Sequence, residues 1–195
     1  MITASVFYAE IPKEEPVIDP QQLREMITEV LATAPRPRLN SMAAVELLML
    51  TAATESKAGT YFRQIRGPAL GVFQMEPNTE TDIFDNYLRY NDDLREWIDG
   101  LKTSWHDHDL QYNLAYQIAM ARIHYLRSPM RMPPADDAPA LARKWKSVYN
   151  THLGKGTVEK ALQDYELYAG GVDLAMARHG AADTIGAYLE AKGRK

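Results

Sequence analysis

Residues 41–55, SMAAVELLMLTAATE, form the most apolar segment of the chain. Apolar side chains occupy nearly every position from Leu47 to Ala53, so a helix made from this segment has almost no polar face. A helix of that kind is stable only when other elements surround it. The sequence therefore predicts a helix that is buried at the centre of the fold and ends near Glu55, because Gly59 fits a helix stop.

The segments on either side of this helix also have helical patterns. Asp19-Pro20 combines a capping residue with a proline at the first helical position, and apolar residues recur on one face of the segment that follows. Further helices are predicted over residues 79–88, 92–101, 109–126, 137–149 and 157–168, the first of them capped by Thr79. The glycines and prolines between residues 57 and 78 favour a loop or a short hairpin. The fold class is therefore mainly α, with at most a small β element.

The length of 195 residues fits one domain with a single core. Within it we distinguish an N-terminal arm and helix (1–40), a central region (41–156), and a C-terminal helical extension (157–195) that we expect to pack on the same domain.

Composition excludes several classes of protein. The net charge of −4 argues against a protein that coats nucleic acid. Cysteine is absent, which excludes disulfides, thiolate metal sites and cysteine nucleophiles. The longest uncharged apolar run is too short to span a membrane, and the N-terminal sequence lacks the basic start and apolar core of a signal peptide. The triplet His106-Asp107-His108 is similar to a metal site, but no further ligand is placed by the sequence, so we expect a solvated loop and no metal.

Glu55 stands at the end of the most apolar helix, where a charged group is costly to bury. Burial and the negative end of the helix dipole both disfavour the carboxylate, so both raise the pKa of Glu55. A glutamic acid that keeps its proton near neutral pH is suited to general acid catalysis. The alternative is a glutamate that points into water at the helix end.

Three motifs occur in a fixed order along the chain. Glu55-Ser56 comes first, GVFQMEPNT (71–79) follows, and VYNTHLGKG (148–156) comes last. Together they resemble the lytic transglycosylases of the lysozyme-like superfamily, in which Glu-Ser, Gly-Leu-Met-Gln-Leu-Met-Pro-x-Thr and Ala-Tyr-Asn-Ala-Gly-x-Gly occur in this order. Between the second and third motifs, ARIHYLRSP (121–129) is similar to the family's helix that ends in Tyr-Leu.

The resemblance implies a lysozyme-like helical domain over residues 41–156, of the goose-type lysozyme and lytic transglycosylase kind. It also implies an enzyme that cleaves the β-1,4 bond between N-acetylmuramic acid and N-acetylglucosamine in peptidoglycan. In such enzymes one glutamic acid protonates the glycosidic oxygen and then takes the proton of the sugar's own C6 hydroxyl, which gives a 1,6-anhydro product without water. Glu55 is the residue that the resemblance places in this role, and no cofactor is required.

The resemblance also implies which residues bind the glycan. They are Ser56, Gln74, Met75, Glu76, Tyr149 and Asn150. Tyr149 is expected to hold Glu55 by a hydrogen bond, with Asn150 supporting the same wall. The alternative for Tyr149 and Asn150 is a pair of residues that merely ends a helix.

The chain departs from the family pattern at several positions. Gln64 stands where the family usually has a serine, and Thr151 and Leu153 interrupt the third motif. Glu76 replaces a methionine. A second carboxylate in the cleft would permit hydrolysis with water, whereas an outward-pointing Glu76 would only favour the start of the next helix.

These features lead to one function hypothesis and two alternatives. The hypothesis is a bacteriophage murein lyase that reaches the cell wall as a virion component or by release from the host cytoplasm at lysis. Its partner is the peptidoglycan glycan strand, and other virion proteins are candidate partners for the two terminal segments. The alternatives are a muramidase that uses water, and a structural virion or adaptor protein that keeps the fold with little activity.

Overall fold

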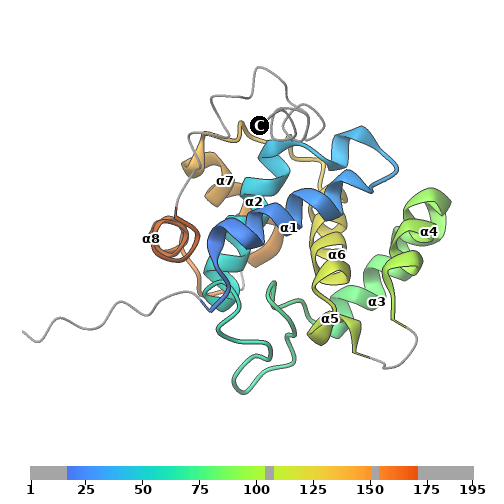
Figure 1. Ribbon diagram of the computed structural model, residues 1–195, viewed down its shortest axis with the longest axis horizontal. Helices are drawn as coiled ribbons and strands as arrows, with labels where there is room; N and C mark the ends of the chain where they lie inside the picture. The colour runs from blue at the N-terminus through green and yellow to red at the C-terminus, as the bar shows by residue number, and fades with distance from the viewer. Residues whose placement is uncertain (1–16, 104–107, 151–153, 171–195) are drawn as a thin grey trace, which may run out of the picture.

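Helix α2 (Met42–Ser56) runs through the middle of the molecule (Figure 1). The structure is a computed structural model that describes residues 17–103, 108–150 and 154–170. Every side chain from Val45 to Ala53 is buried, which confirms the predicted central helix. The surrounding elements are α1 (Pro20–Ala32), α6 (Leu114–Leu126), α7 (Ala138–Trp145) and α8 (Val158–Ala169), and each packs against α2.

Helix α6 separates two hydrophobic clusters. Ile118, Ala121 and Tyr125 face the larger cluster around α2, whereas Tyr116 and Ile123 belong to the smaller one. The smaller cluster joins α6 to three other helices and one short turn, which are α3 (Pro77–Asn86), α4 (Asp92–Leu101), α5 (Asp109–Tyr112) and η2 (Leu88–Tyr90). A further 3-10 turn, η1 (Pro37–Leu39), precedes α2.

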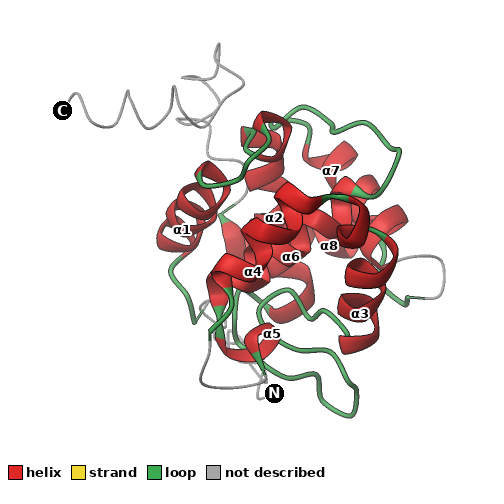
Figure 2. Ribbon diagram, turned by 90° about the vertical axis from the view of Figure 1, so that its right-hand side faces the viewer, coloured by secondary structure: helices red, strands yellow, loops and turns green. Residues whose placement is uncertain are grey.

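Loop 57–76 projects from this helical body between α2 and α3 (Figures 1 and 2). It contains two isolated bridges, Arg63–Leu70 and Leu70–Met75, and the described residues contain no longer strand. The mainly α prediction is confirmed, and the small β element is limited to these bridges.

Three predicted helix boundaries differ in the structure. Helix α3 begins at Pro77 with Glu76 as its N-cap residue, so Thr79 lies in the first turn and is not the cap. The single helix predicted over residues 109–126 is interrupted at Asn113, whose side chain accepts a hydrogen bond from the Tyr116 N–H and thereby starts α6. Helix α7 stops at Trp145 and continues as the π-helical turn η3 (Lys146–Asn150).

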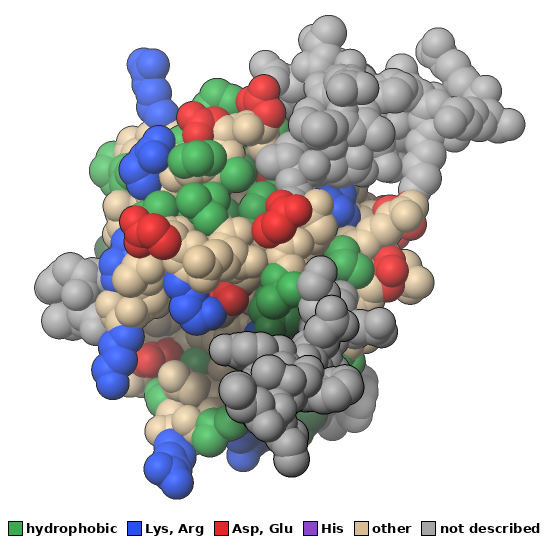
Figure 3. All heavy atoms as spheres, turned by 90° about the vertical axis from the view of Figure 1, so that its left-hand side faces the viewer, with side chains coloured by type: hydrophobic (Ala, Val, Ile, Leu, Met, Phe, Trp, Pro, Cys, Tyr) green, Lys and Arg blue, Asp and Glu red, His purple; other side chains and the backbone are tan. Residues whose placement is uncertain are grey.

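The predicted terminal segments are described in part. Residues 157–169, the start of the C-terminal extension, pack as α8 against α2, while the N-terminal arm through Pro16 and the chain after Gly170 lie outside the described residues. Seen from the side of α8, hydrophobic, acidic and basic side chains are interspersed over the coloured surface (Figure 3). None of the described helices is both long and apolar enough to cross a membrane.

Candidate active site

A cleft of about 710 Å³ opens beside the C-terminal end of α2. Its walls come from loop 57–76, the first turn of α3, the end of α6, η3, and the pair Gly154 and Lys155. The lining residues are Glu55, Gln64, Ala69, Gln74, Met75, Glu76, Thr79, His124, Tyr149, Asn150, Gly154 and Lys155. The structure thus brings six of the seven predicted site residues onto one cavity, all except Ser56: Glu55, Gln74, Met75, Glu76, Tyr149 and Asn150.

Glu55 lies in the last turn of α2 and is partly buried. Its Oε1 accepts a hydrogen bond of 2.9 Å from the indole Nε1 of Trp145. Burial raises the pKa of Glu55 from 4.5 to about 7, and the hydrogen bond from Trp145 opposes part of that rise because it stabilises the anion. The carboxyl group therefore keeps its proton up to a pH well above the usual pKa of glutamate, as the sequence predicted.

Trp145 is a site residue that the sequence analysis missed. It belongs to no motif, and its side chain is fully buried in the last turn of α7. Its role arises only because α7 packs against α2 and brings the indole N–H to a residue 90 positions away in the chain.

Tyr149 borders the cleft, but its hydrogen bond corrects the prediction. The phenol oxygen donates to the Phe73 carbonyl at 2.9 Å and not to Glu55. Its ring packs at 5.4 Å from the ring of Tyr125 and 5.0 Å from that of His124. Burial, followed by the charge of Glu55, raises the pKa of Tyr149, so the phenol stays protonated and keeps η3 attached to loop 57–76.

The motif at residues 71–76 has an unusual backbone. Gly71 has φ +74, and a Cβ atom there would meet the Leu110 carbonyl at 2.2 Å, so only glycine fits. Gln74 also has a left-handed φ of 45, and its side-chain Nε2 donates to the Gly71 carbonyl at 2.7 Å. Such strain in a residue other than glycine is frequent at functional sites, and Gln74 borders the cleft.

Ser56 does not reach the cleft. Its side chain is fully buried, donates to the Ala52 carbonyl and accepts a hydrogen bond of 2.9 Å from the Gly59 N–H. This corrects the expectation that Ser56 contacts substrate, because the hydroxyl shapes the end of α2 instead. Asn150 lies at the cleft as expected, and its side-chain oxygen accepts a hydrogen bond of 2.7 Å from Lys146.

Glu76 both borders the cleft and stands at the start of α3, so its position fits each of the two predicted roles. It is the N-cap residue of α3, where a carboxylate is favoured by the helix dipole, although its side chain makes no capping hydrogen bond. It is exposed and also borders the cleft that contains Glu55.

His124 is a second cleft residue that the sequence analysis did not single out. Its Nδ1 lies 3.0 Å from Nη2 of Arg127, so Nδ1 must accept the hydrogen bond, and Arg127 in turn pairs with Asp82 of α3. Burial and the nearby charge of Arg127 lower the pKa of His124 to about 4. The imidazole is therefore neutral at the pH where Glu55 is still protonated.

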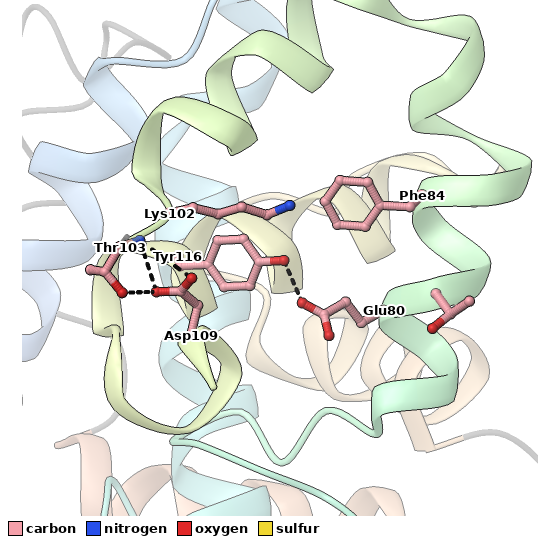
Figure 4. A pocket seen from close by; sticks show the side chains of 7 residues that line it. Glu80, Phe84, Lys102, Thr103, Asp109 and Tyr116 are labelled. Atoms are coloured by element: carbon pink, nitrogen blue, oxygen red, sulfur yellow. Dashed lines mark hydrogen bonds between the residues drawn. The ribbon is translucent and has the colours of Figure 1, made fainter. Parts of the chain in front are cut away.

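A second cavity, of about 480 Å³, lies between α3, the end of α4, α5 and α6 (Figure 4). Its polar groups largely satisfy one another. Tyr116 donates to Glu80, Asp109 accepts from the Thr103 hydroxyl at 2.7 Å, and the Lys102 ammonium lies 4.2 Å from the centre of the Phe84 ring. The cleft at Glu55 offers a strongly perturbed acid instead, so it is the stronger candidate for chemistry.

The triplet that suggested a metal site lies mostly in the segment 104–107. His106 and Asp107 lie outside the described residues. Among the residues that are described, no group of three His, Asp or Glu side chains is placed to hold a metal ion.

Comparison of the chain with protein-family models, with curated proteins and with solved structures finds no match.

Proposed function

We propose that this chain is a lytic transglycosylase that cleaves the glycan strand of peptidoglycan in the Glu55 cleft. The observation that carries the proposal is a carboxyl group in a cleft of about 710 Å³ with its pKa raised to about 7. That value lets one group donate a proton and then take one back near neutral pH, which is the requirement of the reaction.

Glu55 performs both proton transfers. Trp145 holds Oε1, which leaves Oε2 to carry the proton. In the first step Oε2 gives its proton to the glycosidic oxygen, and the bond from that oxygen to C1 of the muramic acid breaks. In the second step the Glu55 carboxylate takes the proton of the C6 hydroxyl while O6 bonds to C1. The product is the 1,6-anhydro sugar, and Glu55 ends protonated as it began.

A water-using muramidase is the second candidate, and the position of Glu76 favours it. Glu76 borders the same cleft and is exposed, so water can reach its carboxylate. In that reaction a second carboxylate either activates water or attacks C1.

The test is mass analysis of the products that the full chain releases from purified peptidoglycan. We expect 1,6-anhydro ends, and we expect Glu55→Gln to reduce cleavage by about 100-fold or more with an unchanged fold. Glu96→Gln is the matched control, because Glu96 is an exposed glutamate on α4, outside the cleft lining. Absence of cleavage by the parent protein, or full activity of a folded Glu55→Gln variant, would overturn the proposal.

A further inference from the structure

Loop 57–76, one wall of the Glu55 cleft, contains a short hairpin, residues 62–71, which we call the rim hairpin. The Gln64 N–H donates to the Ala69 carbonyl at 2.8 Å, and the Gly71 N–H donates to the Phe62 carbonyl at 3.0 Å. Gln64 and Ala69 line the cleft. A segment that lies across this hairpin therefore also lies at the entrance of the cleft.

Exposed apolar side chains are concentrated around the rim hairpin. Phe62 and Ile65 belong to the hairpin itself, and Ile65 keeps 73% of its surface exposed. The exposed Tyr112 of α5 follows Gln111, whose side chain accepts a hydrogen bond of 3.0 Å from Arg63. Single apolar side chains on a surface need no explanation, but a group of them at the edge of a cleft indicates a binding surface.

The same surface is basic. Arg63 and Arg66 are both exposed, and the segment 57–75 contains no acidic residue. Arg66 also has a φ of +61, in the left-handed region that few residues other than glycine adopt without strain. Because guanidinium groups bind carboxylates by paired hydrogen bonds, the occupant of this surface should combine apolar side chains with carboxylates.

The chain enters the described structure at the base of this loop. The Ile18 N–H donates to the Ala58 carbonyl at 3.3 Å. The Ile18 side chain also packs against Gly59 so closely that a Cβ atom there would meet it at 2.5 Å. Residues 1–16, which lie outside the described residues, are therefore attached through Val17 beside the rim hairpin.

The sequence of residues 1–16, MITASVFYAEIPKEEP, has the composition that the surface requires. Glu10, Glu14 and Glu15 outnumber the single Lys13, and the run VFYA (6–9) supplies apolar and aromatic side chains. The acidic end of this segment adjoins Val17, so it lies nearest to the point of attachment.

The segment is also long enough to reach the hairpin. The eight residues from Val17 back to Ala9 extend up to about 26 Å, whereas the six residues from Ala58 to Gln64 separate those two positions by at most about 22 Å. Attachment at the base of the loop also keeps the segment at a high effective concentration near the hairpin.

We propose that residues 1–16 dock on the rim hairpin of their own chain and cover the entrance of the Glu55 cleft. The glutamates pair with Arg63 and Arg66, and the VFYA run packs against Phe62 and Ile65. A polymer has to displace the segment before it reaches Glu55. The docking itself does not depend on the proposed function, and only its effect on cleavage does.

The experiment uses the absence of cysteine from the chain, because any disulfide then joins two engineered positions. The full-length variant Ala9→Cys/Gln64→Cys reports docking at the cleft edge. Ala9→Cys/Gln22→Cys is the matched control, since Gln22 is exposed on α1 and lies only five residues from Val17. Oxidised glutathione is added, and non-reducing gels and peptide mass analysis measure the rate of disulfide formation. Melting temperatures establish that each variant is folded.

We expect the disulfide between positions 9 and 64 to form at least about ten-fold faster than that between 9 and 22, although an undocked segment reaches position 22 by the shorter tether. High salt should reduce the difference. Equal rates would leave the hairpin surface to some other occupant and overturn the inference. Disulfide-linked dimers as the main product would assign the surface to a second copy of the chain and also overturn it.

A charge exchange tests the ion pairs. In the 9/64 variant, Arg63→Asp/Arg66→Asp should lower the rate to that of the control, and aspartate tolerates the left-handed backbone at position 66. Adding Glu14→Lys/Glu15→Lys to that variant should restore the fast rate. A slow rate that the second exchange does not restore would show that the arginines act only on the hairpin and would overturn the pairing.

Cleavage of purified peptidoglycan tests the cover. The oxidised 9/64 variant should cleave at least about ten-fold more slowly than the same variant after reduction, because the locked segment cannot leave the cleft entrance. Equal activity of the two forms would overturn the covering role. If the parent protein does not cleave at all, the proposed function fails, and the rates of disulfide formation still decide whether the segment docks.

Discussion

The indole N–H of Trp145 donates to Oε1 of Glu55 at 2.9 Å, which joins the end of α7 to the end of α2 across the candidate active site. The bond stabilises the ionised form of Glu55 and limits the rise in pKa that burial causes. Trp145 is thus a positioning residue that also adjusts the acidity of the group that transfers the proton.

Replacing Trp145 by phenylalanine should raise the pKa of Glu55 above about 7. General acid catalysis needs the protonated carboxyl, so the fall in kcat/KM on the alkaline side of the pH profile should move to higher pH. Trp97→Phe is the control, because Trp97 donates to the Thr33 hydroxyl, away from the cleft. A pH profile that stays in place or moves to lower pH in a folded Trp145→Phe variant would contradict the assignment.

The raised pKa of Glu55 also predicts how stability depends on pH. Between pH 4.5 and about 7 the unfolded chain releases the Glu55 proton while the folded chain retains it, so the free energy of unfolding falls as pH rises. At about 1.4 kcal/mol for each pKa unit, the accumulated cost above pH 7 reaches at most about 3.5 kcal/mol. Glu55→Gln removes this cost.

Glu55→Gln should therefore be more stable than the parent above pH 7, and the difference should disappear below pH 4.5. Chemical denaturation at a series of pH values measures it, with Glu96→Gln as the exposed control. A difference in stability that is the same at pH 4 and pH 8 would show that burial does not shift this group.

Tyr149→Phe tests the attachment between η3 and loop 57–76. The substitution leaves the buried Phe73 carbonyl without its partner, so we expect a loss of about 1–3 kcal/mol in the free energy of unfolding. Because the same bond holds the wall next to Gln74, kcat should fall by about 10-fold to 100-fold, with a smaller change in KM.

Tyr90→Phe is the control for this variant, since 72% of the Tyr90 surface is exposed. An unchanged kcat in Tyr149→Phe, despite the lost stability, would limit Tyr149 to a structural role.

The central helix and several of its neighbours could be predicted because their signals are local. A segment without a polar face, such as residues 41–55, has to be buried, and Asp19 caps α1 with its own side chain at 2.9 Å from the Gln22 N–H. The break at Asn113 could not be predicted in the same way. Its side-chain nitrogen donates to the Leu101 carbonyl, a contact that exists only once α4 and α6 are in place.

In the candidate site, too, local sequence signals could be predicted and contacts between distant elements could not. The position of Glu55 at the end of the most apolar helix led to that residue, the three motifs led to Gln74 and Tyr149, and all three residues border one cleft. Trp145 was missed because it acts through a contact between helices and stands in no recognisable pattern. His124 lies within the segment 121–129 that resembles a family helix, but the resemblance gave it no role. The Tyr149 hydroxyl was assigned to the wrong partner, since the π-helical turn that directs it to Phe73 has no sequence signal.

The variant Glu76→Met distinguishes a lyase from a hydrolase. Methionine is the residue that the family pattern has at this position. We predict that Glu76→Met still releases 1,6-anhydro ends, at a stability cost of at most about 1 kcal/mol from the lost interaction with the N-terminus of α3. The lyase route uses Glu55 for both proton transfers and needs no second carboxylate. Mass analysis of the sugar products from parent and variant measures the outcome. Reducing-end muramic acid as the main product of the parent, lost in Glu76→Met, would instead identify Glu76 as the group that activates water.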